Sequence, residues 1–430
     1  MRLAHPAASP QSRPHLFPSA PPTPPLIGGA AGALLHGAAG GQGLRLTPYD
    51  VFPILGWNNH LETIFAAFFR SVPEVCLRRE CIRTIDDGSV ALDWCCGDSR
   101  LLPADAPVLI LLPGLTGGSG DSYVRHMLLK ARSKGWRVVV FNSRGCGDSP
   151  VTTAQLVWSR GYLFTRDLSE VINHVSSRYP KSKIYAVGWS LGANILVRYL
   201  GQLNFSICTK VATTVNAYPL IAGISQLSYL WAVSLCNPFN LVIADEDFHK
   251  GFNNVYDKAL AGALRRIFKS IHSFSMIYCA FHAYPLDMGG EYNIPLAANA
   301  QSVRDFDEAL TRVSFGFKSV DDYYFNSSSS DSIKDVRTPL LCIQAANDPI
   351  APSRGIPRDE IQANPHCLLI VTPQGGHLGW LAGSEAPFGA PWTDTVVMDF
   401  LELLHTTVAT GDLNVGGDMK SHPPVAVPVQ

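Results

Sequence analysis

A serine between two glycines lies where a β-rich run meets a helical pattern. Residues 188–192 read Gly-Trp-Ser-Leu-Gly, after the run 183–187 and before apolar residues at positions 195, 196, 199 and 200. A G-x-S-x-G string alone recurs by chance in chains of this length. At a strand-to-helix junction it has a mechanical reason, because the glycines let backbone pack closely around a serine held on a strained turn. Ser190 is therefore our candidate nucleophile, and an ordinary glycine-flanked turn is the alternative.

A serine hydroxyl needs a base to take its proton and a carboxylate to fix the tautomer of that base. With a serine on such a turn, the expected order along the chain is serine, acid, histidine. Asp348 follows the apolar run 340–345, and His377 ends a Gly-containing loop after the run 367–371. We therefore predict that Asp348 orients His377, which acts as general base toward the serine. A turn aspartate before a proline and a plain loop histidine are the alternatives.

A serine activated in this way can attack the carbonyl carbon of an acyl group. Such acyl transfer also requires hydrogen-bond donors beside the carbonyl oxygen, which becomes negative. The backbone N–H of Leu191, at the start of the helix after the serine, is placed to supply one. The Gly-containing loop 113–118, which follows the run 107–112, is the source we expect for the second, and we choose the N–H of Leu115. The alternative is that this loop only ends a strand. A phosphate-binding loop is disfavoured because no G-x-x-x-x-G-K-[ST] string follows.

The composition narrows the kinds of ligand. With 34 Lys and Arg against 35 Asp and Glu, the net charge is -1, which gives no electrostatic case for a nucleic acid. Only 16% of residues are charged, so we expect a neutral or lipid-like ligand. A membrane span would require about 18 uninterrupted apolar residues, and the sequence contains no such run. Peripheral association with a membrane and the oligomeric state stay open.

Cysteines and histidines indicate no metal chemistry. The ten cysteines include no C-x-x-C pair and several lie in apolar runs, a pattern that favours reduced, buried thiols. No His/Cys/Asp cluster has metal spacing and no G-x-G-x-x-G opens a dinucleotide fold, so we expect no metal and no cofactor. His60, His126, His366 and His405 are interpreted as structural.

From about residue 76 short β-rich runs alternate with amphipathic helices, which is typical of a mostly parallel sheet with helices on both faces. Runs 76–85 and 89–96, separated by Asp-Asp-Gly, predict an opening antiparallel hairpin. The predicted central strands are 107–112, 137–141, 183–188, 339–345 and 366–372. The predicted helices that pack on them include 166–178, the stretch after the serine, and 393–407.

The remaining segments divide the chain. Residues 1–49 contain no acidic residue and are rich in Pro, Ser and Ala, so they predict either a disordered leader or an organelle transit peptide. Residues 50–408 form the catalytic domain, in which the strand rhythm gives way to helical sequence at about 245–330, as expected for an inserted cap. Residues 409–430 predict a disordered tail. The expected location is intracellular, in the cytoplasm or the chloroplast.

Several further strings resemble one family. The chain is similar to α/β hydrolases, and within them to a subgroup of plant embryogenesis-associated proteins, animal lipid hydrolases and yeast medium-chain ethyl ester synthase/esterases. The resemblance covers roughly residues 50–408, and the strings that carry it are 57–63, 111–117, 142–147, 188–194, 236–239 and 347–349. It implies an eight-stranded, mostly parallel α/β-hydrolase fold with an inserted helical cap. The family pattern places nucleophile, acid and base on Ser190, Asp348 and His377.

The activity that this resemblance implies is carboxylic ester hydrolysis, as by a serine carboxylesterase or acylglycerol lipase. The candidate substrates are acylglycerols, short- to medium-chain acyl esters or phospholipids. An acyltransferase that uses the same acyl-enzyme and a non-catalytic receptor on the same fold are the alternatives.

One stretch departs from the subgroup. About twenty extra residues, 213–231, split one expected strand, and they are either a genuine loop or retained intron sequence. If they displaced that strand, the cap and the acyl pocket would be disturbed.

Overall fold

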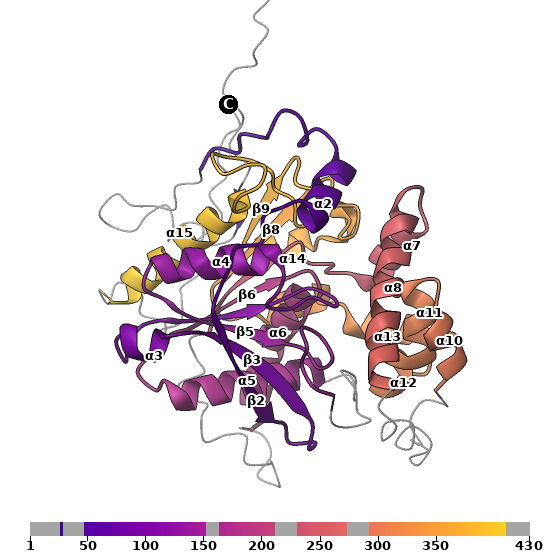
Figure 1. The fold of residues 1–430 in the computed structure, drawn as a ribbon, viewed down its shortest axis with the longest axis horizontal. Helices are drawn as coiled ribbons and strands as arrows, with labels where there is room; N and C mark the ends of the chain where they lie inside the picture. Colours follow the sequence, from indigo (N-terminus) through magenta and orange to yellow (C-terminus); the bar gives the residue numbers. More distant parts are fainter. Residues whose placement is uncertain (1–25, 29–46, 152–162, 211–229, 273–291, 410–430) are drawn as a thin grey trace, which may run out of the picture.

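The computed structural model describes residues 26–28, 47–151, 163–210, 230–272 and 292–409 (Figure 1). Its centre is a nine-stranded sheet in the order β1-β9-β8-β7-β6-β4-β5-β3-β2. The six strands from β5 to β9 in this order pair in parallel, and β1, β2 and β3 pair antiparallel at the edges. The predicted α/β class and the mostly parallel sheet are confirmed.

The elements follow the predicted rhythm within a few residues. The strands are β1 (Leu26–Gly28), β2 (Leu77–Arg83), β3 (Ser89–Cys95), β4 (Val108–Leu112), β5 (Arg137–Asn142), β6 (Ile184–Trp189), β7 (Trp231–Leu235), β8 (Leu340–Ala345) and β9 (Cys367–Thr372). The helices outside the cap are α2 (Asn59–Phe68), α3 (Asp98–Leu101), α4 (Ser122–Ser133), α5 (Leu163–Arg178), α6 (Leu191–Lys210), η3 (Ser330–Asp335), η4 (Ser353–Gly355), α14 (Arg358–Ala363) and α15 (Trp392–Ala409). None of the helices described is long and apolar enough to cross a membrane.

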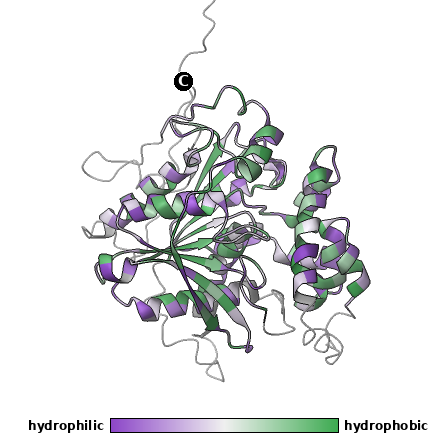
Figure 2. Ribbon diagram, in the orientation of Figure 1, coloured by the Kyte–Doolittle hydropathy of each residue, from purple (hydrophilic) through white to green (hydrophobic). Residues whose placement is uncertain are grey.

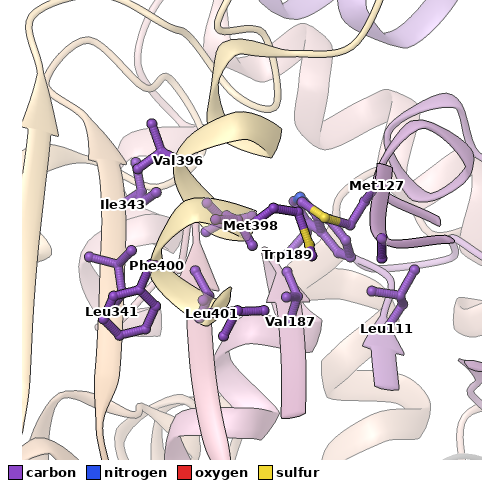
Figure 3. Packing of buried hydrophobic residues seen from close by; sticks show 14 of the residues in the cluster. Leu111, Met127, Val187, Trp189, Leu341, Ile343, Val396, Met398, Phe400 and Leu401 are labelled. Atoms are coloured by element: carbon purple, nitrogen blue, oxygen red, sulfur yellow. The ribbon is translucent and has the colours of Figure 1, made fainter. Parts of the chain in front are cut away.

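Helices cover both faces of the sheet, so its central strands are buried on both sides and read as unbroken apolar runs. On one face, Met127 of α4 and Leu401 of α15 join Leu111 and Val187 of the sheet in one apolar cluster (Figure 3). On the other face α5, α6 and α14 supply the second cluster. The hydrophobic strands lie at the centre of the molecule (Figure 2). This packing fixes the carboxyl ends of the strands, where the candidate site residues follow.

The cap helices stand to one side of the sheet (Figure 1). They are α7 (Leu241–Phe248), α8 (Asn253–His272), α10 (Ile294–Asn299), α11 (Val303–Phe306), the π-helix η2 (Asp307–Thr311), α12 (Arg312–Phe315) and α13 (Val320–Ser327). They have an apolar cluster of their own, which includes Phe268, Phe306 and Leu310. Leu115, in the loop after β4, packs against that cluster, so the cap contacts the sheet domain at this loop.

Two short parts of the predicted leader are ordered. Leu26–Gly28 form β1, which pairs antiparallel with β9 and adds a ninth strand to the eight expected. Tyr49 is buried and its ring packs edge-on against Trp392 at 5.1 Å. Without β1, β9 would present an open edge, and three residues are enough to cover part of it. Disorder is therefore the wrong prediction for these residues. The other residues of the leader up to 46, and the tail after 409, lie outside the described residues.

The prediction of reduced thiols is wrong for one pair of cysteines. Cys76 and Cys96 form a disulfide with a Cα–Cα distance of 5.4 Å. The register of the hairpin explains the pair, since Leu77 lies opposite Cys95 and the next residues outward are the two cysteines. Four of the remaining cysteines described are buried thiols, as expected, at positions 95, 236, 342 and 367.

The strand that follows the extra residues is in place. Trp231–Leu235 form β7, which is buried and pairs in parallel with β6 and β8. Residues 211–229, most of the departure, lie outside the described residues. The displacement considered above does not occur, so the sheet order around the candidate nucleophile is intact.

Candidate active site

Ser190 lies on a sharp turn between β6 and α6. Its φ of 52° falls in the left-handed region that non-glycine residues rarely adopt, and the next residue already begins the helix. The Ser190 N–H donates a 2.9 Å hydrogen bond to the carbonyl of Leu235 at the end of β7. The neighbouring strand thus holds the strained residue, and the serine lines a cavity.

The turn depends on a glycine. A Cβ on Gly192 would collide with the carbonyl oxygens of Leu112 and Pro113, where β4 ends. Helix α6 therefore starts directly against the loop after β4. A Cβ on Gly114 in that loop would lie 3.2 Å from the Cβ of Ser190. This close approach brings the predicted oxyanion loop to the candidate nucleophile.

A buried tyrosine and an aspartate hold this loop. Gly114 N–H donates to the Tyr123 hydroxyl at 3.0 Å, which donates to Asp121 Oδ2 at 3.0 Å. The same carboxylate oxygen accepts the Gly118 N–H at 3.1 Å. Burial raises the pKa of Asp121, and the tyrosine hydrogen bond opposes that change. The hydrogen bonds of Gly114 and Gly118 therefore fix the loop at both of its ends.

The two predicted oxyanion donors line the same cavity as Ser190. Leu191 is the first residue of α6, and the amide of a first helical residue has no partner inside its helix. Within the part of the chain that the structure describes, no hydrogen bond uses the N–H of Leu115. Among the described residues neither amide has a hydrogen-bond acceptor, so both can donate to an external one.

Asp348 and His377 follow β8 and β9 and meet at the carboxyl edge of the sheet. His377 Nδ1 lies 2.9 Å from Asp348 Oδ2 and 3.1 Å from Oδ1. Asp348 Oδ1 also accepts the N–H groups of Ile350 and Ala351, each at 2.8 Å. The carboxylate is thus fixed by backbone while it faces the ring, an arrangement that leaves Nε2 as the nitrogen available for proton transfer.

Ser190 and His377 are buried and line one cavity of about 440 Å³. No hydrogen bond joins them, and a bond of this kind often tightens only when substrate binds. The cap contributes most of the opposite wall, with apolar residues such as Leu260, Leu264 and Phe306. The arrangement places a serine, an oriented imidazole and two free amides at one end of an apolar space.

The comparison with known families decides the assignment. The family model described as alpha/beta hydrolase fold matches residues 107–383, which include Ser190, Asp348 and His377. The chain belongs to the α/β-hydrolase family.

Relatives of this α/β hydrolase fall in the predicted subgroup. The embryogenesis-associated protein EMB8 of Picea glauca is 62% identical over 83% of this chain and 72% of its own length. The phospholipase ABHD3 of Homo sapiens is 31% identical over 81% of this chain and 77% of its own length. A monoacylglycerol lipase of Saccharomyces cerevisiae is 32% identical over 74% of this chain and 64% of its own length. The predicted resemblance is confirmed.

Helix α2 holds the loop that carries His377, a role that our reading of the sequence missed. His377 N–H donates to Thr63 Oγ1 at 2.9 Å, and Gly375 N–H donates to Glu62 Oε2 at 2.8 Å. A Cβ on Gly376 would lie 2.6 Å from Thr63 Oγ1, so the loop and the helix are in close contact. The available signals were the polar pair Glu62 and Thr63 within an otherwise apolar stretch and the string 57–63 of the family resemblance, which contains both.

Arg70, just after α2, extends this contact. Its guanidinium donates to the carbonyl of Leu378 at 2.8 Å and also to that of Gly379. Burial lowers the pKa of Arg70 to about 10, while Asp394 and Glu62 oppose that change. Burial raises the pKa of Glu62 to about 7. Two buried ionisable groups, Arg70 and Glu62, thus form hydrogen bonds with the backbone of the loop that carries His377.

The histidines interpreted as structural lie elsewhere. His405 Nδ1 lies 2.7 Å from the Tyr185 hydroxyl, and His60 Nδ1 lies 3.0 Å from that of Tyr256. Neither these two nor His126 and His366 line the cavity among the residues described. Of the histidines in the described residues, His377 is therefore the one that the structure brings to the candidate nucleophile.

Proposed function

We propose that this α/β hydrolase is a serine carboxylic ester hydrolase that works through an acyl-enzyme on Ser190. The observation that carries the proposal is that Ser190, His377 and the residues of both free amides line one cavity. The pair formed by His377 and Asp348 has the geometry of an oriented general base.

The reaction has two steps. Ser190 Oγ attacks the ester carbonyl carbon while His377 Nε2 takes its proton, and the amides of Leu115 and Leu191 hold the resulting oxyanion. Collapse breaks the carbon–oxygen bond, and the imidazolium gives its proton to the leaving alcohol. Water, deprotonated by His377, then attacks the acyl carbon and releases free acid and Ser190. Asp348 stabilises the imidazolium in both steps.

The walls of the cavity support an acyl chain as ligand. Leu241, Leu264 and Ile267 line it, and burial of such chains contributes roughly 25 cal/mol per Å² of apolar surface. A monoacylglycerol lipase and a phospholipase are among the relatives. We propose acylglycerols or short- to medium-chain acyl esters as the substrate class.

Hydrolysis of p-nitrophenyl esters from acetate to palmitate by wild type and Ser190→Ala tests this function. We expect activity with a chain-length optimum that falls by at least about a thousandfold in the variant. Equal rates for the two proteins would refute the proposal. Product analysis with added ethanol or glycerol serves as the second arm, because new esters in place of free acid would identify an acyltransferase.

A further inference from the structure

The segment that precedes the sheet exposes its apolar side chains and buries its charged ones. In residues 51–73 the charged side chains are Glu62 and Arg70, which are 0% and 4% exposed. Trp57, Phe68 and Phe69 are 66%, 77% and 60% exposed. All exposed residues of this segment are apolar except Ser71. A surface helix of a globular protein normally has the reverse arrangement.

The inversion has a cause in the active site. The polar face of α2 is turned inward because Glu62 and Thr63 bind the backbone of the His377 loop. With that face occupied, the apolar residues on the other side of the helix point outward. The same geometry that fixes the general base therefore creates an apolar surface.

Three phenylalanine rings pack together at the end of α2. Phe65 stacks with Phe69 at 5.7 Å and contacts Phe388 at 5.3 Å. The indole N–H of Trp57 donates to the carbonyl of Ile54 at 2.8 Å, so this ring can leave water without losing a hydrogen bond. We call the exposed residues of 51–73 together with Phe388 the α2 patch. Exposed apolar patches of this kind mark interaction sites.

The α2 patch continues into the active-site cavity. Phe68 is exposed, and it lines the cavity together with Ile64 and Ala67 of the same helix. On the cap side, His60 of α2 contacts the half-exposed Phe252 at 4.6 Å. Figure 1 shows α2 on the side of the sheet domain that faces the cap. A lipid that leaves this surface would thus have an apolar route toward Ser190.

We propose that the α2 patch docks on an uncharged or zwitterionic lipid surface and that the enzyme draws its substrate from it. The absence of exposed charge in residues 51–73 matches such a surface, whereas anionic lipids attract clusters of Lys and Arg. The choice of a lipid surface rests on the proposed function, because the cavity that adjoins the patch is the one assigned to an acyl chain. The docking surface itself is independent of catalysis.

Vesicle binding by the full chain tests the docking surface. All proteins carry Ser190→Ala, so that hydrolysis cannot alter the vesicles and failure of docking is separable from failure of the proposed reaction. The test variant adds Phe69→Ser and Phe388→Ser. The matched control adds Ile85→Ser and Leu101→Ser, which are also well exposed but lie at the β2–β3 turn and in α3, away from α2.

Co-sedimentation with phosphatidylcholine vesicles should show binding by the Ser190→Ala parent and by the control. The test variant should partition at least about tenfold less, since two rings no longer leave water. A second variant, Ile54→Ser with Trp57→Ser, should weaken binding likewise if the first fails to fold. Binding should change little between low and high salt, because no charge pair contributes.

Three results of the vesicle experiments would overturn the proposal. They are no vesicle binding by the folded parent, equal binding by parent and α2 variants, and binding that needs phosphatidylserine and disappears in high salt. Light scattering provides the remaining check. A parent dimer that the α2 substitutions convert to monomer would assign the patch to a second copy of this chain instead of a lipid surface.

Discussion

Thr63 uses one hydroxyl to serve two backbone groups. It accepts the N–H of His377 at 2.9 Å and donates to the carbonyl of Asn59 at 2.7 Å. A buried N–H that loses its acceptor costs about 1–3 kcal/mol, so the loop would shift to find another. Since small errors in the position of a catalytic group lower the rate steeply, we regard Thr63 as a positioning residue for the general base.

Thr63→Val should lower kcat by roughly tenfold with little change in KM, because the substrate contacts are kept while His377 moves. Thr63→Ser keeps both hydrogen bonds and should restore most of the activity. Steady-state kinetics with p-nitrophenyl butyrate on both variants checks this, after a thermal melt has established that each is folded. Equal kcat for the valine and serine variants would rule out the positioning role.

Helix α2 also contains a buried carboxyl that makes stability depend on pH. Burial raises the pKa of Glu62 from 4.5 to about 7, although the Gly375 N–H and Arg70 favour the charged form. A carboxyl with a raised pKa binds its proton more tightly in the folded state. Its contribution to stability is therefore full below about pH 4.5 and is lost as the pH rises to about 7.

Glu62→Gln removes this titration while the amide oxygen can still accept from Gly375. The stability of wild type relative to the variant should therefore fall between about pH 4.5 and 7, by up to roughly 3 kcal/mol. Urea unfolding of both proteins at several pH values measures the difference. Asp394 and Asp307 titrate in both proteins, so their contributions cancel in this difference. Parallel stability curves for the two proteins would contradict the assignment.

The elements differ in how well the sequence predicted them. Strands such as β4 and β8 are recognisable because burial on both faces makes their residues uniformly apolar. Asp348 and His377 could be placed because both stand directly after such strands. The role of α2 could not be predicted, since Thr63 and Glu62 meet residues more than 300 positions away in the chain. Local pattern holds no information about contacts at that separation.

Residues of the cap and of the sheet domain both line the cavity, so the chain-length preference that we propose depends on the whole molecule. Leu260 of α8 is half-buried and lines the cavity on the cap side. A larger side chain there shortens the space for an acyl chain without touching Ser190. The hairpin disulfide and β1 do not take part in the cavity. The disulfide depends on the register of the hairpin, and β1 depends on its pairing with the edge strand β9, neither of which composition reveals.

Leu260→Trp should lower kcat/KM for long-chain p-nitrophenyl esters by about tenfold or more and leave the acetate ester nearly unchanged. Leu260→Ala is the matched variant and should keep or extend the range of chains accepted. The ratio of kcat/KM for two esters on one preparation is independent of the active fraction. A uniform loss across all chain lengths would place the acyl chain elsewhere.

The account stands on an activated hydroxyl at Ser190. Labelling with a fluorophosphonate, followed by intact mass measurement and peptide mapping, tests it most directly. We predict a single adduct on Ser190 in the folded protein, and its loss on unfolding and in Asp348→Asn, where the tautomer of His377 is no longer fixed. A folded protein that takes no label, or takes it on another residue, would contradict the account.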